Sequence, residues 1–435
     1  MLLGLMAIAA IAQSPALRDS ASVARLLGSL ASADSAVCEL AGRALTNWWG
    51  GADGELPIPM PMPMPMPIPM PFAGGGMDIH IPDLGPHWSG GVEGPVLGAF
   101  RAGLRDPSRC VRHISARMVG RSKPDWAYQT FTAMARDASP GIRETGLLGL
   151  GEIEDRRSSN TLTDALGDRD EGVRAMAAWA LGELERVETI PALGKALGDE
   201  SAVVRRRVAW ALGQIEDPAA LASLERALRD RDPSVRRVAA WAIGEIESPR
   251  GVPALRTALA DADPEVRETA VWALAEIESP AAVEPLAPLA RDRDPGVRRM
   301  AAWALGQIES ADAVPVLAPL VKDANRDVRL SALWALGQIE NAGSVESVGP
   351  GLKDKDPAVR SMAAWALGQI EAASAVRLLT PLLTDPEDEV RVMAAWALGQ
   401  IESPAALSAL EAARDDRTPS VRRAVRWAIS QIDDH

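Results

Sequence analysis

The fold is decided by Asp292-Arg-Asp-Pro-Gly-Val-Arg-Arg-Met-Ala-Ala-Trp-Ala-Leu-Gly-Gln-Ile-Glu309, a stretch that returns every 31 residues with small changes. Its tryptophan, Trp303, is one of nine that keep this spacing between Trp179 and Trp427. An arginine keeps the same step from Arg174 to Arg422, and an aspartate stands six residues before each of these arginines. Strict self-similarity at such a period is typical of a solenoid, in which each repeat buries its apolar face only against its neighbours.

Each repeat has the signals of two helices. Asp294-Pro295 is an N-cap followed by proline at the first helical position, and it predicts a helix over 297–308. A shorter helix is expected over 312–321, where apolar residues recur at helical spacing and a proline stands near the start. The repeats contain no alternation typical of strands. We therefore predict an all-α, right-handed α-α solenoid (a superhelix) of about twelve helix pairs.

The twelve repeats are not continuous. Residues 1–12 are uncharged and apolar, and they end in a small-x-small pattern, Ala10-Ile-Ala12, that is typical of a signal-peptidase site. We interpret 1–12 as a signal peptide, 13–50 as a degenerate first repeat, 51–92 as an insertion, and 93–435 as repeats 2–12. Twelve residues are too few to span a bilayer, which needs about 20, and no other stretch is apolar enough to cross one.

The recurring Asp-x-Asp-Pro-x-Val-Arg-x-x-Ala-Ala-x-Ala-Leu-Gly-x-Ile-Glu pattern resembles the HEAT-repeat family, and in particular its short 31-residue, phycobilisome-lyase HEAT-like subclass. In that family, the aspartate and the arginine six residues later form a ladder between successive repeats. The resemblance implies that Asp292 and Arg298 join neighbouring repeats and have a structural role.

The tryptophans have two interpretations, and the sequence leaves both open. On a helical wheel, Val297, Ala301, Ala304 and Ile308 cluster on a core direction, while Trp303 lies well off it, beside Gln307. Tryptophan and the residue four positions later share a helix face, so a Trp-x-x-x-Gln ladder runs along the array. The spacing is similar to the Trp-x-x-x-Asn ladder of armadillo repeats, which grips extended peptides. The alternative is that each indole packs across the small residues of the adjacent repeat.

If the ladder binds a partner, the groove residues are predicted to be Trp210, Gln214, Trp241, Trp272, Trp303, Gln307, Trp334, Gln338, Trp365, Gln369, Trp396 and Gln400.

The insertion is dominated by alternating prolines between Leu56 and Phe72, which forbid a helix and favour an extended, polyproline-II-like chain. Three interpretations stay open. The segment is a semi-rigid surface loop, or the thioethers of Met60, Met62, Met64 and Met66 bind Cu(I), or the segment lies in the tryptophan groove as a built-in pseudo-ligand.

The two cysteines flank this insertion. In an oxidising compartment, Cys38 and Cys110 could form a disulfide, and in the cytosol they would be two buried thiols.

The composition excludes several classes of function. The chain of 435 residues carries 46 Lys and Arg against 59 Asp and Glu, a net charge of −13, which argues against binding the phosphate backbone of nucleic acids. It contains neither a nucleophile-elbow nor a P-loop motif, and neither Cys-x-x-Cys nor His-Glu-x-x-His. We therefore expect no enzyme activity and no cofactor.

The function predicted from the sequence is a non-catalytic scaffold that binds a protein or an extended peptide through the Trp-x-x-x-Gln ladder. A small-ligand binder, with sugars stacking on tryptophan or copper on the methionines, is the first alternative. A purely structural spacer is the second. The signal-peptide interpretation places the protein in the periplasm or outside the cell; without it, the protein is cytoplasmic.

Overall fold

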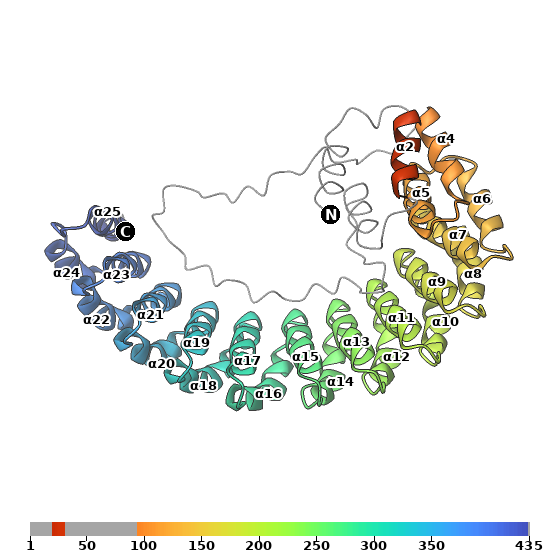
Figure 1. The fold of residues 1–435 in the computed structure, drawn as a ribbon. Coiled ribbons are helices and arrows are strands. Elements are labelled where there is room, and N and C mark those ends of the chain that lie inside the picture. Colours follow the sequence, from red (N-terminus) through yellow and green to blue (C-terminus); the bar gives the residue numbers. More distant parts are fainter. Residues whose placement is uncertain (1–19, 31–93, 434–435) are drawn as a thin grey trace. The chain divides into compact units, whose positions relative to one another are not determined.

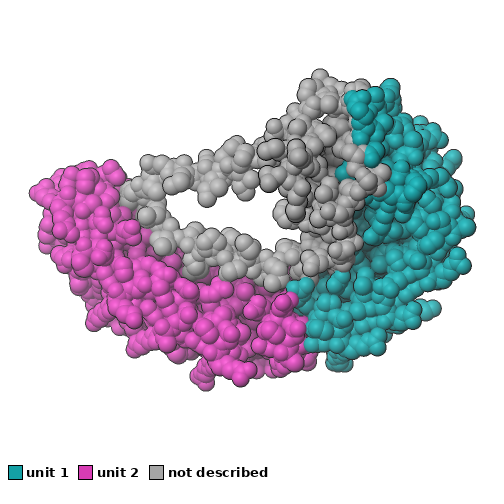
Figure 2. Space-filling model, viewed as in Figure 1, with its two compact units in different colours: residues 1–60, 78–246 teal, residues 61–77, 247–435 magenta. Residues whose placement is uncertain are grey.

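A computed structural model of the chain describes residues 20–30 and 94–433. These residues form two compact units: unit 1 up to Ile246, and unit 2 from Glu247 onward (Figure 2). The described part of the chain contains helices and no strand, so the all-α prediction is confirmed. None of the described helices is both long enough and apolar enough to cross a membrane.

Among the described residues, unit 1 contains eleven α-helices, which are labelled in Figure 1. They are α2 (Ser20–Leu30), α4 (Gly94–Gly103), α5 (Arg109–Ser122), α6 (Ala127–Met134), α7 (Pro140–Ile153), α8 (Ser159–Ala165), α9 (Glu171–Glu183), α10 (Ile190–Ala196), α11 (Ala202–Gln214), α12 (Leu221–Ala227) and α13 (Pro233–Glu245).

Unit 2 continues the alternation of a short first helix and a long second helix. Its helices are α14 (Val252–Ala258), α15 (Pro264–Glu276), α16 (Val283–Leu286), α17 (Pro295–Gln307), α18 (Val314–Leu317), α19 (Arg326–Gln338), α20 (Val345–Val348), α21 (Pro357–Ile370), α22 (Val376–Leu379), α23 (Asp388–Gln400), α24 (Leu407–Ala412) and α25 (Pro419–Asp433).

Within each unit, the second helices pack on one another as one layer, and the first helices form a second layer beside them (Figure 1). The predicted cap of the second helix is confirmed at α17, where the Asp294 carboxylate accepts a hydrogen bond from the backbone N–H of Gly296. The predicted core is also confirmed: Val297, Ala301, Ala304 and Ile308 are all at most 5% exposed.

The first helices differ from the prediction in the middle of unit 2. The helix expected over 312–321 is split into a 3₁₀ turn at Ala311–Ala313, the α-helix α18, and a second 3₁₀ helix at Ala318–Lys322. Proline at position 319 has no N–H to continue the α-helical pattern, so the last turn tightens. Pro288, Pro350 and Pro381 have the same effect in the corresponding repeats.

Candidate functional site

Most long helices of each unit pack on the next through a tryptophan and a glycine. The glycine stands three residues after the repeat position of tryptophan, which is Leu148 in α7, and it faces the indole of the following repeat. A Cβ placed on Gly337 would lie only 2.7 Å from Cζ3 of Trp365 and 3.1 Å from the Cα of Ala366. A side chain at this glycine would therefore prevent the close approach of the two helices.

The same joint recurs in both units. A Cβ at the glycine would meet Cζ3 of the next tryptophan within 3.0 Å in each of the following pairs: Gly151 and Trp179, Gly182 and Trp210, Gly213 and Trp241, Gly306 and Trp334, Gly337 and Trp365, Gly368 and Trp396, and Gly399 and Trp427.

These joints bury one edge of the indole. Tryptophans that the wheel places away from the core are nonetheless buried or half-buried. Five are at most 8% exposed, namely Trp179, Trp210, Trp241, Trp272 and Trp365. The others, Trp303, Trp334, Trp396 and Trp427, are half-buried. The benzo edge of the indole thus packs between repeats. Binding of a partner by the tryptophans stays a prediction.

The glutamines four residues after tryptophan are not used in the same way. Gln307, Gln338, Gln369, Gln400 and Gln431 are all half-exposed, one on each long helix from α17 to α25. Within the described residues, none of these five amides takes part in a hydrogen bond. The predicted Gln214 on α11 is half-exposed as well. We call the five glutamines and the tryptophans that precede them by four residues, Trp303, Trp334, Trp365, Trp396 and Trp427, the Trp/Gln stripe.

The face that carries this stripe is uncharged over its middle repeats. The positions four residues before tryptophan are Leu330 on α19, Ser361 on α21 and Val392 on α23, which are buried or half-buried. Arginines occupy this position only toward the two ends of the stripe, at Arg299 and Arg423. A partner lying along α19 to α23 would therefore meet amides and indole edges and no fixed charge.

The corresponding face of unit 1 is charged. On α5, Arg109, His113, Arg117 and Arg121 follow one another at four-residue spacing and share a helix face. Arg109 Nη2 lies 2.7 Å from Oε1 of Glu144 on α7.

A second carboxylate on α7, that of Glu152, serves two of these arginines. It lies 3.3 Å from Nη1 of Arg117 and 3.2 Å from Nε of Arg121. Arg117 occupies the register position of tryptophan, and its guanidinium lies 5.7 Å from the ring centre of Trp179. This network was not predicted, although arginine in the tryptophan position was its visible signal.

Burial within this network shifts two pKa values. Burial lowers the pKa of the Arg117 guanidinium to about 10, although the charge of Glu152 opposes the shift. Burial also raises the pKa of Glu183, the residue four positions after Trp179, to about 7, and the negative charge of Glu152 adds to this effect. The register position that carries a neutral glutamine throughout the Trp/Gln stripe thus carries a titrating carboxyl in unit 1.

The Asp–Arg ladder has a different register from the one implied by the resemblance. Arg298 does contact Asp292, but through the backbone: its Nη1 donates to the Asp292 carbonyl at 2.7 Å. The carboxylate partner is Asp323 of the next repeat, at 2.8 Å from Arg298 Nε and 2.9 Å from Nη2. The Asp292 carboxylate instead accepts from the backbone N–H of Asp294.

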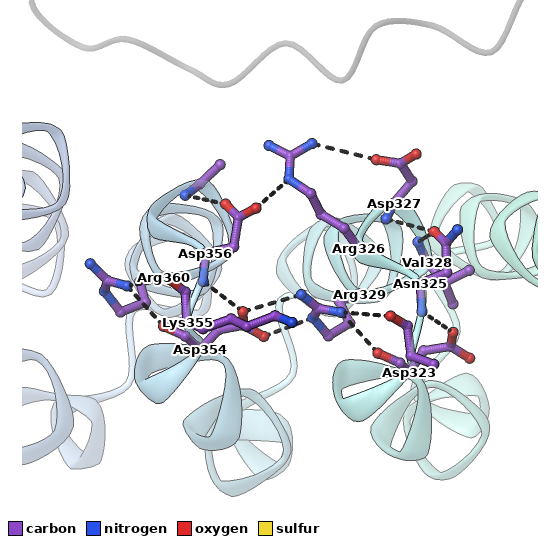
Figure 3. Close-up of polar contacts among 12 residues, drawn as sticks. Asp323, Asn325, Arg326, Asp327, Val328, Arg329, Asp354, Lys355, Asp356 and Arg360 are labelled. Atoms are coloured by element: carbon purple, nitrogen blue, oxygen red, sulfur yellow. Dashed lines mark hydrogen bonds and ion pairs between the residues drawn. The ribbon is translucent and has the colours of Figure 1, made fainter.

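Figure 3 shows the next step of the ladder, where Arg329 lies between the Asp323 carbonyl and the Asp354 carboxylate. The arginine-to-aspartate pairs of this ladder include Arg143–Asp168, Arg174–Asp199, Arg205–Asp230, Arg298–Asp323, Arg329–Asp354, Arg360–Asp385 and Arg391–Asp416. Hydrogen bonds from Arg298 hold the pKa of Asp323 below its usual range, so the carboxylate stays charged. The ladder therefore ties neighbouring repeats, as the resemblance implies.

An exposed glutamate ends each repeat in a backbone conformation that favours glycine. Glu309 and Glu340 have φ angles of 50°, in the left-handed region. The same holds for Glu154, Glu185, Glu216, Glu247, Glu278, Glu371 and Glu402. A side chain in this conformation costs about 1 kcal/mol relative to glycine. In unit 2 these carboxylates stand two residues beyond the stripe glutamines.

The last described helix differs from the inner ones at two repeat positions. Positions directly before tryptophan carry Ala302, Leu333, Ala364 and Ala395 in unit 2, all buried. On α25 this position is Arg426, and the position of the joint glycine is Ser430; both are exposed. The outer face of α25 is therefore polar where the inner repeats are small and apolar.

The remaining predicted sites lie wholly or partly outside the described residues. This applies to the signal peptide, to Met60, Met62, Met64 and Met66, and to Cys38, so copper binding, export and a disulfide with the buried Cys110 stay predictions. Among the residues that the structure describes, no group of three or more His, Cys, Asp or Glu side chains is placed to hold a metal ion.

Several solved structures resemble this chain. A chain in the structure of Kap95p with RanGDP is 15% identical, with a TM-score of 0.54 over 78% of this chain and 55% of that one. A Kap121p mutant is 14% identical, with a TM-score of 0.53 over 94% of this chain and 49% of that one. This chain thus spans about half the length of these two proteins, and the likeness shows the solenoid fold.

The predicted lyase subclass has weaker structural support. A chain in the complex of CpcE and CpcF of phycocyanin lyase from Nostoc sp. PCC7120 is 23% identical, with a TM-score of 0.32 over 51% of this chain and 92% of that one. This likeness carries no argument, so the subclass stays a prediction. A search of curated proteins found no match.

The match to a family is extensive. The sequence model of HEAT repeats matches residues 98–174, 159–232, 225–294, 283–350 and 345–430, which together cover more than three quarters of the chain. The helix pairs, the Asp–Arg ladder and this match agree, and the chain belongs to the HEAT-repeat family.

Proposed function

We propose that this protein is a non-catalytic scaffold that binds an extended, basic polypeptide segment along the Trp/Gln stripe of unit 2. The observation that carries the proposal is the row of five half-exposed glutamines, from Gln307 to Gln431, whose amides make no hydrogen bond within the described residues. An amide offers two donors and one acceptor, which suits the alternating N–H and C=O groups of an extended backbone. A groove filled by its own hydrogen bonds would not offer them.

The spacing of the repeats suits an extended chain. Packed helices lie about 8–10 Å apart, and an extended polypeptide advances about 3.3 Å per residue. One repeat therefore corresponds to about three residues of a bound peptide. The five glutamines would follow a segment of about 13 residues, and each would meet an equivalent point of its backbone.

Each indole would contact the bound segment through one edge only. In each joint the benzo edge, which contains Cζ3, lies against the glycine of the preceding repeat. The Nε1 donor is on the opposite edge of the ring. In the half-buried Trp334 and Trp396 part of the side chain is exposed, and in this proposal the polar edge contacts the segment beside the glutamines.

The charge of the partner follows from the glutamates that border the stripe. Glu309, Glu340 and Glu371 are exposed, although the left-handed backbone at each would be less strained with glycine. Strain retained in consecutive repeats is a reason to suspect a functional role. A row of carboxylates beside an uncharged stripe favours a peptide with lysine or arginine side chains.

The likeness to karyopherins supports a polypeptide partner. One matched structure is of Kap121p bound to the extreme C-terminus of the phosphatase Cdc14p, with a TM-score of 0.53 at 14% identity. Another is a complex of Kap95 with Nup1, with a TM-score of 0.52. These solenoids hold polypeptide segments, and we transfer only that class of partner to this chain.

The test is a selection from a displayed library of random 13-residue peptides against the full chain, followed by affinity measurements with the enriched peptides. A variant with Gln338, Gln369 and Gln400 changed to alanine is expected to bind at least tenfold more weakly, since each lost amide contributes about 0.5–1.5 kcal/mol. The matched control is Gln214→Ala, which removes the same amide at the same register position of unit 1. It is expected to leave the affinity unchanged.

Ionic strength separates the alternatives. A basic peptide attracted by the glutamate row should bind more weakly as salt rises, whereas a sugar stacked on tryptophan would bind almost independently of salt. The proposal is wrong if no peptide is enriched, or if the enriched peptides bind the triple variant as tightly as the native chain.

A further inference from the structure

One joint inside unit 2 is built differently from the others, and we propose that it is a hinge. It lies between α15 and α17. On its C-terminal side, the repeats from α17 to α25 form a single block that carries the whole Trp/Gln stripe. This inference does not depend on the proposed function, because it rests on how the repeats pack.

The first difference is the residue at the joint. Position 275, three residues after Trp272, is alanine where the corresponding positions of α17, α19, α21 and α23 are glycine. At the α17 joint, a Cβ on Gly306 would lie 2.7 Å from Cζ3 of Trp334 and 2.8 Å from the Cα of Ala335. Real Cβ atoms do not approach so closely, so the helix after Ala275 must stand further away. The methyl group of Ala275 fills this interface, since the residue is 1% exposed.

The second difference is the ladder. Arg267 on α15 makes no hydrogen bond or ion pair with Asp292 within the described residues. Its Nη1 still donates to its own repeat, to the Asp261 carbonyl at 2.7 Å. In the next repeat, the matching arginine, Arg298, reaches Asp323 at 2.8 Å. A wider spacing between α15 and α17 explains why the aspartate is out of reach.

An ion pair across this joint lies in the layer of first helices. Arg256 on α14 forms a hydrogen-bonded ion pair with Glu284 on α16, and both side chains are more than half exposed. Exposed ion pairs contribute little to stability. The first helices are thus joined by a weak ion pair, and the second helices, α15 and α17, lack both the glycine–tryptophan contact and the Asp–Arg ion pair. We infer that it opens on the side of the second helices and pivots on the side of the first.

Beyond the hinge, each interface between successive long helices has both the glycine–tryptophan contact and the Asp–Arg ion pair. Glycine meets the next tryptophan at Gly306, Gly337, Gly368 and Gly399. The aspartate ladder runs through Arg298, Arg329, Arg360 and Arg391. Interfaces that are close-packed and hydrogen-bonded have few alternative arrangements. A bend in unit 2 is therefore expected to concentrate at α15 and α17.

The test compares two neighbouring joints in the same full chain. Spin labels are placed on encoded keto amino acids at Glu278 and Glu309, and in a second sample at Glu309 and Glu340, which are all exposed at the ends of successive long helices. Electron paramagnetic resonance then gives the distance distribution across each joint. The 278–309 distribution is expected to be broader than the 309–340 distribution. Equal widths would overturn the proposal.

Two substitutions exchange the alanine and the glycine that distinguish the two joints. Ala275→Gly is expected to narrow the 278–309 distribution toward that of its neighbour, and Gly306→Ala is expected to broaden the 309–340 distribution. Amide hydrogen exchange provides the second readout: Gly306→Ala should accelerate exchange in α17 and α19 several-fold while α23 and α25 are unaffected. If Gly306→Ala leaves both the distribution and the exchange unchanged, the joint residue does not control the spacing, and the proposal fails.

Discussion

Unit 1 and unit 2 share one scaffold and differ in what they place on the same helix face. The Trp-on-Gly joint and the Asp–Arg ladder occur in both, for example at Gly182 with Trp210 in unit 1 and at Gly337 with Trp365 in unit 2. The face of the second helices, however, carries interlocked arginines and glutamates on α5 and α7, and amides on α17 to α25.

This difference shows which repeat positions are structural and which are free to specialise. Positions that touch the next repeat hold the same residue types in both units, because a changed volume there alters the spacing of the helices. Positions that face away from the neighbouring repeats vary without disturbing it. Ion pairs occupy those positions in unit 1, whereas the glutamines of unit 2 remain available to a partner. Four predictions test this division, from the largest expected effect to the smallest.

The largest effect on the free energy of unfolding is expected when a contact between repeats that both units share is removed. Trp365→Ala removes an indole that is 5% exposed between α19 and α21, and it should lower the free energy of unfolding by about 3–5 kcal/mol. Urea denaturation followed by circular dichroism measures the change. Trp396→Ala is the control: that side chain is half-buried, so its loss should cost clearly less. Equal costs would mean that inter-repeat burial does not set the energetics.

The second prediction concerns a substitution that gives unit 1 the glutamine found at the same repeat position in unit 2. The pKa of Glu183, raised to about 7 by burial and by Glu152, exceeds the value near 4.3 expected in the unfolded chain. The folded state then binds the proton more tightly, so this contribution to stability is complete below pH 4.3 and is lost as the pH rises through 7. Glu183→Gln should raise the unfolding free energy at pH 8 by about 2 kcal/mol.

Urea denaturation at pH 5 and pH 8 measures this effect, and the gain should shrink at pH 5. The control is Glu309→Gln in unit 2, which makes the same substitution at an exposed carboxyl outside the buried network. A gain at Glu183 that is the same at both pH values would show that the carboxyl does not titrate as inferred.

The third prediction concerns what the units have in common. Gly213→Ala in unit 1 and Gly337→Ala in unit 2 each introduce a Cβ that would lie within 3.0 Å of the next indole. Overpacking typically costs about 1–3 kcal/mol, and the better helix propensity of alanine returns about 1 kcal/mol. Both variants should therefore lose up to about 2 kcal/mol, measured by urea denaturation. A loss in only one unit would break the equivalence of the joints.

The smallest effect is expected at the ends of the repeats. Glu309→Gly relieves a left-handed backbone at φ 50° and should stabilise the protein by about 0.5–1 kcal/mol. Thermal unfolding measures the gain. In the peptide-binding assay the same variant should weaken the salt dependence, because one carboxylate beside the stripe is lost. A destabilised variant would indicate that the Glu309 side chain makes stabilising contacts that outweigh its strain.

The sequence alone determined the repeat, the helix pairs and the core. The 31-residue period follows from residues that must match their neighbours, and the caps follow from local chemistry, as at Asp294. It also supplied the candidate groove residues, since tryptophan and the residue four positions later necessarily share a helix face. The split of the first helices at Pro319 was within reach as well, because proline acts on its own backbone.

Only the tertiary structure decided how neighbouring repeats meet. Single-helix geometry placed Trp303 and its equivalents away from the core, yet all nine are buried or half-buried, and seven of them pack against a glycine of the preceding repeat. The ladder partner of Arg298 proved to be Asp323, 25 residues away, because the contact lies across two repeats and cannot be read within one. The free amides of the stripe and the altered joint at Ala275 are likewise properties of the packed array. Hydrogen bonding and close packing depend on which atoms are brought together, and a periodic pattern specifies the residues but not the distances between them.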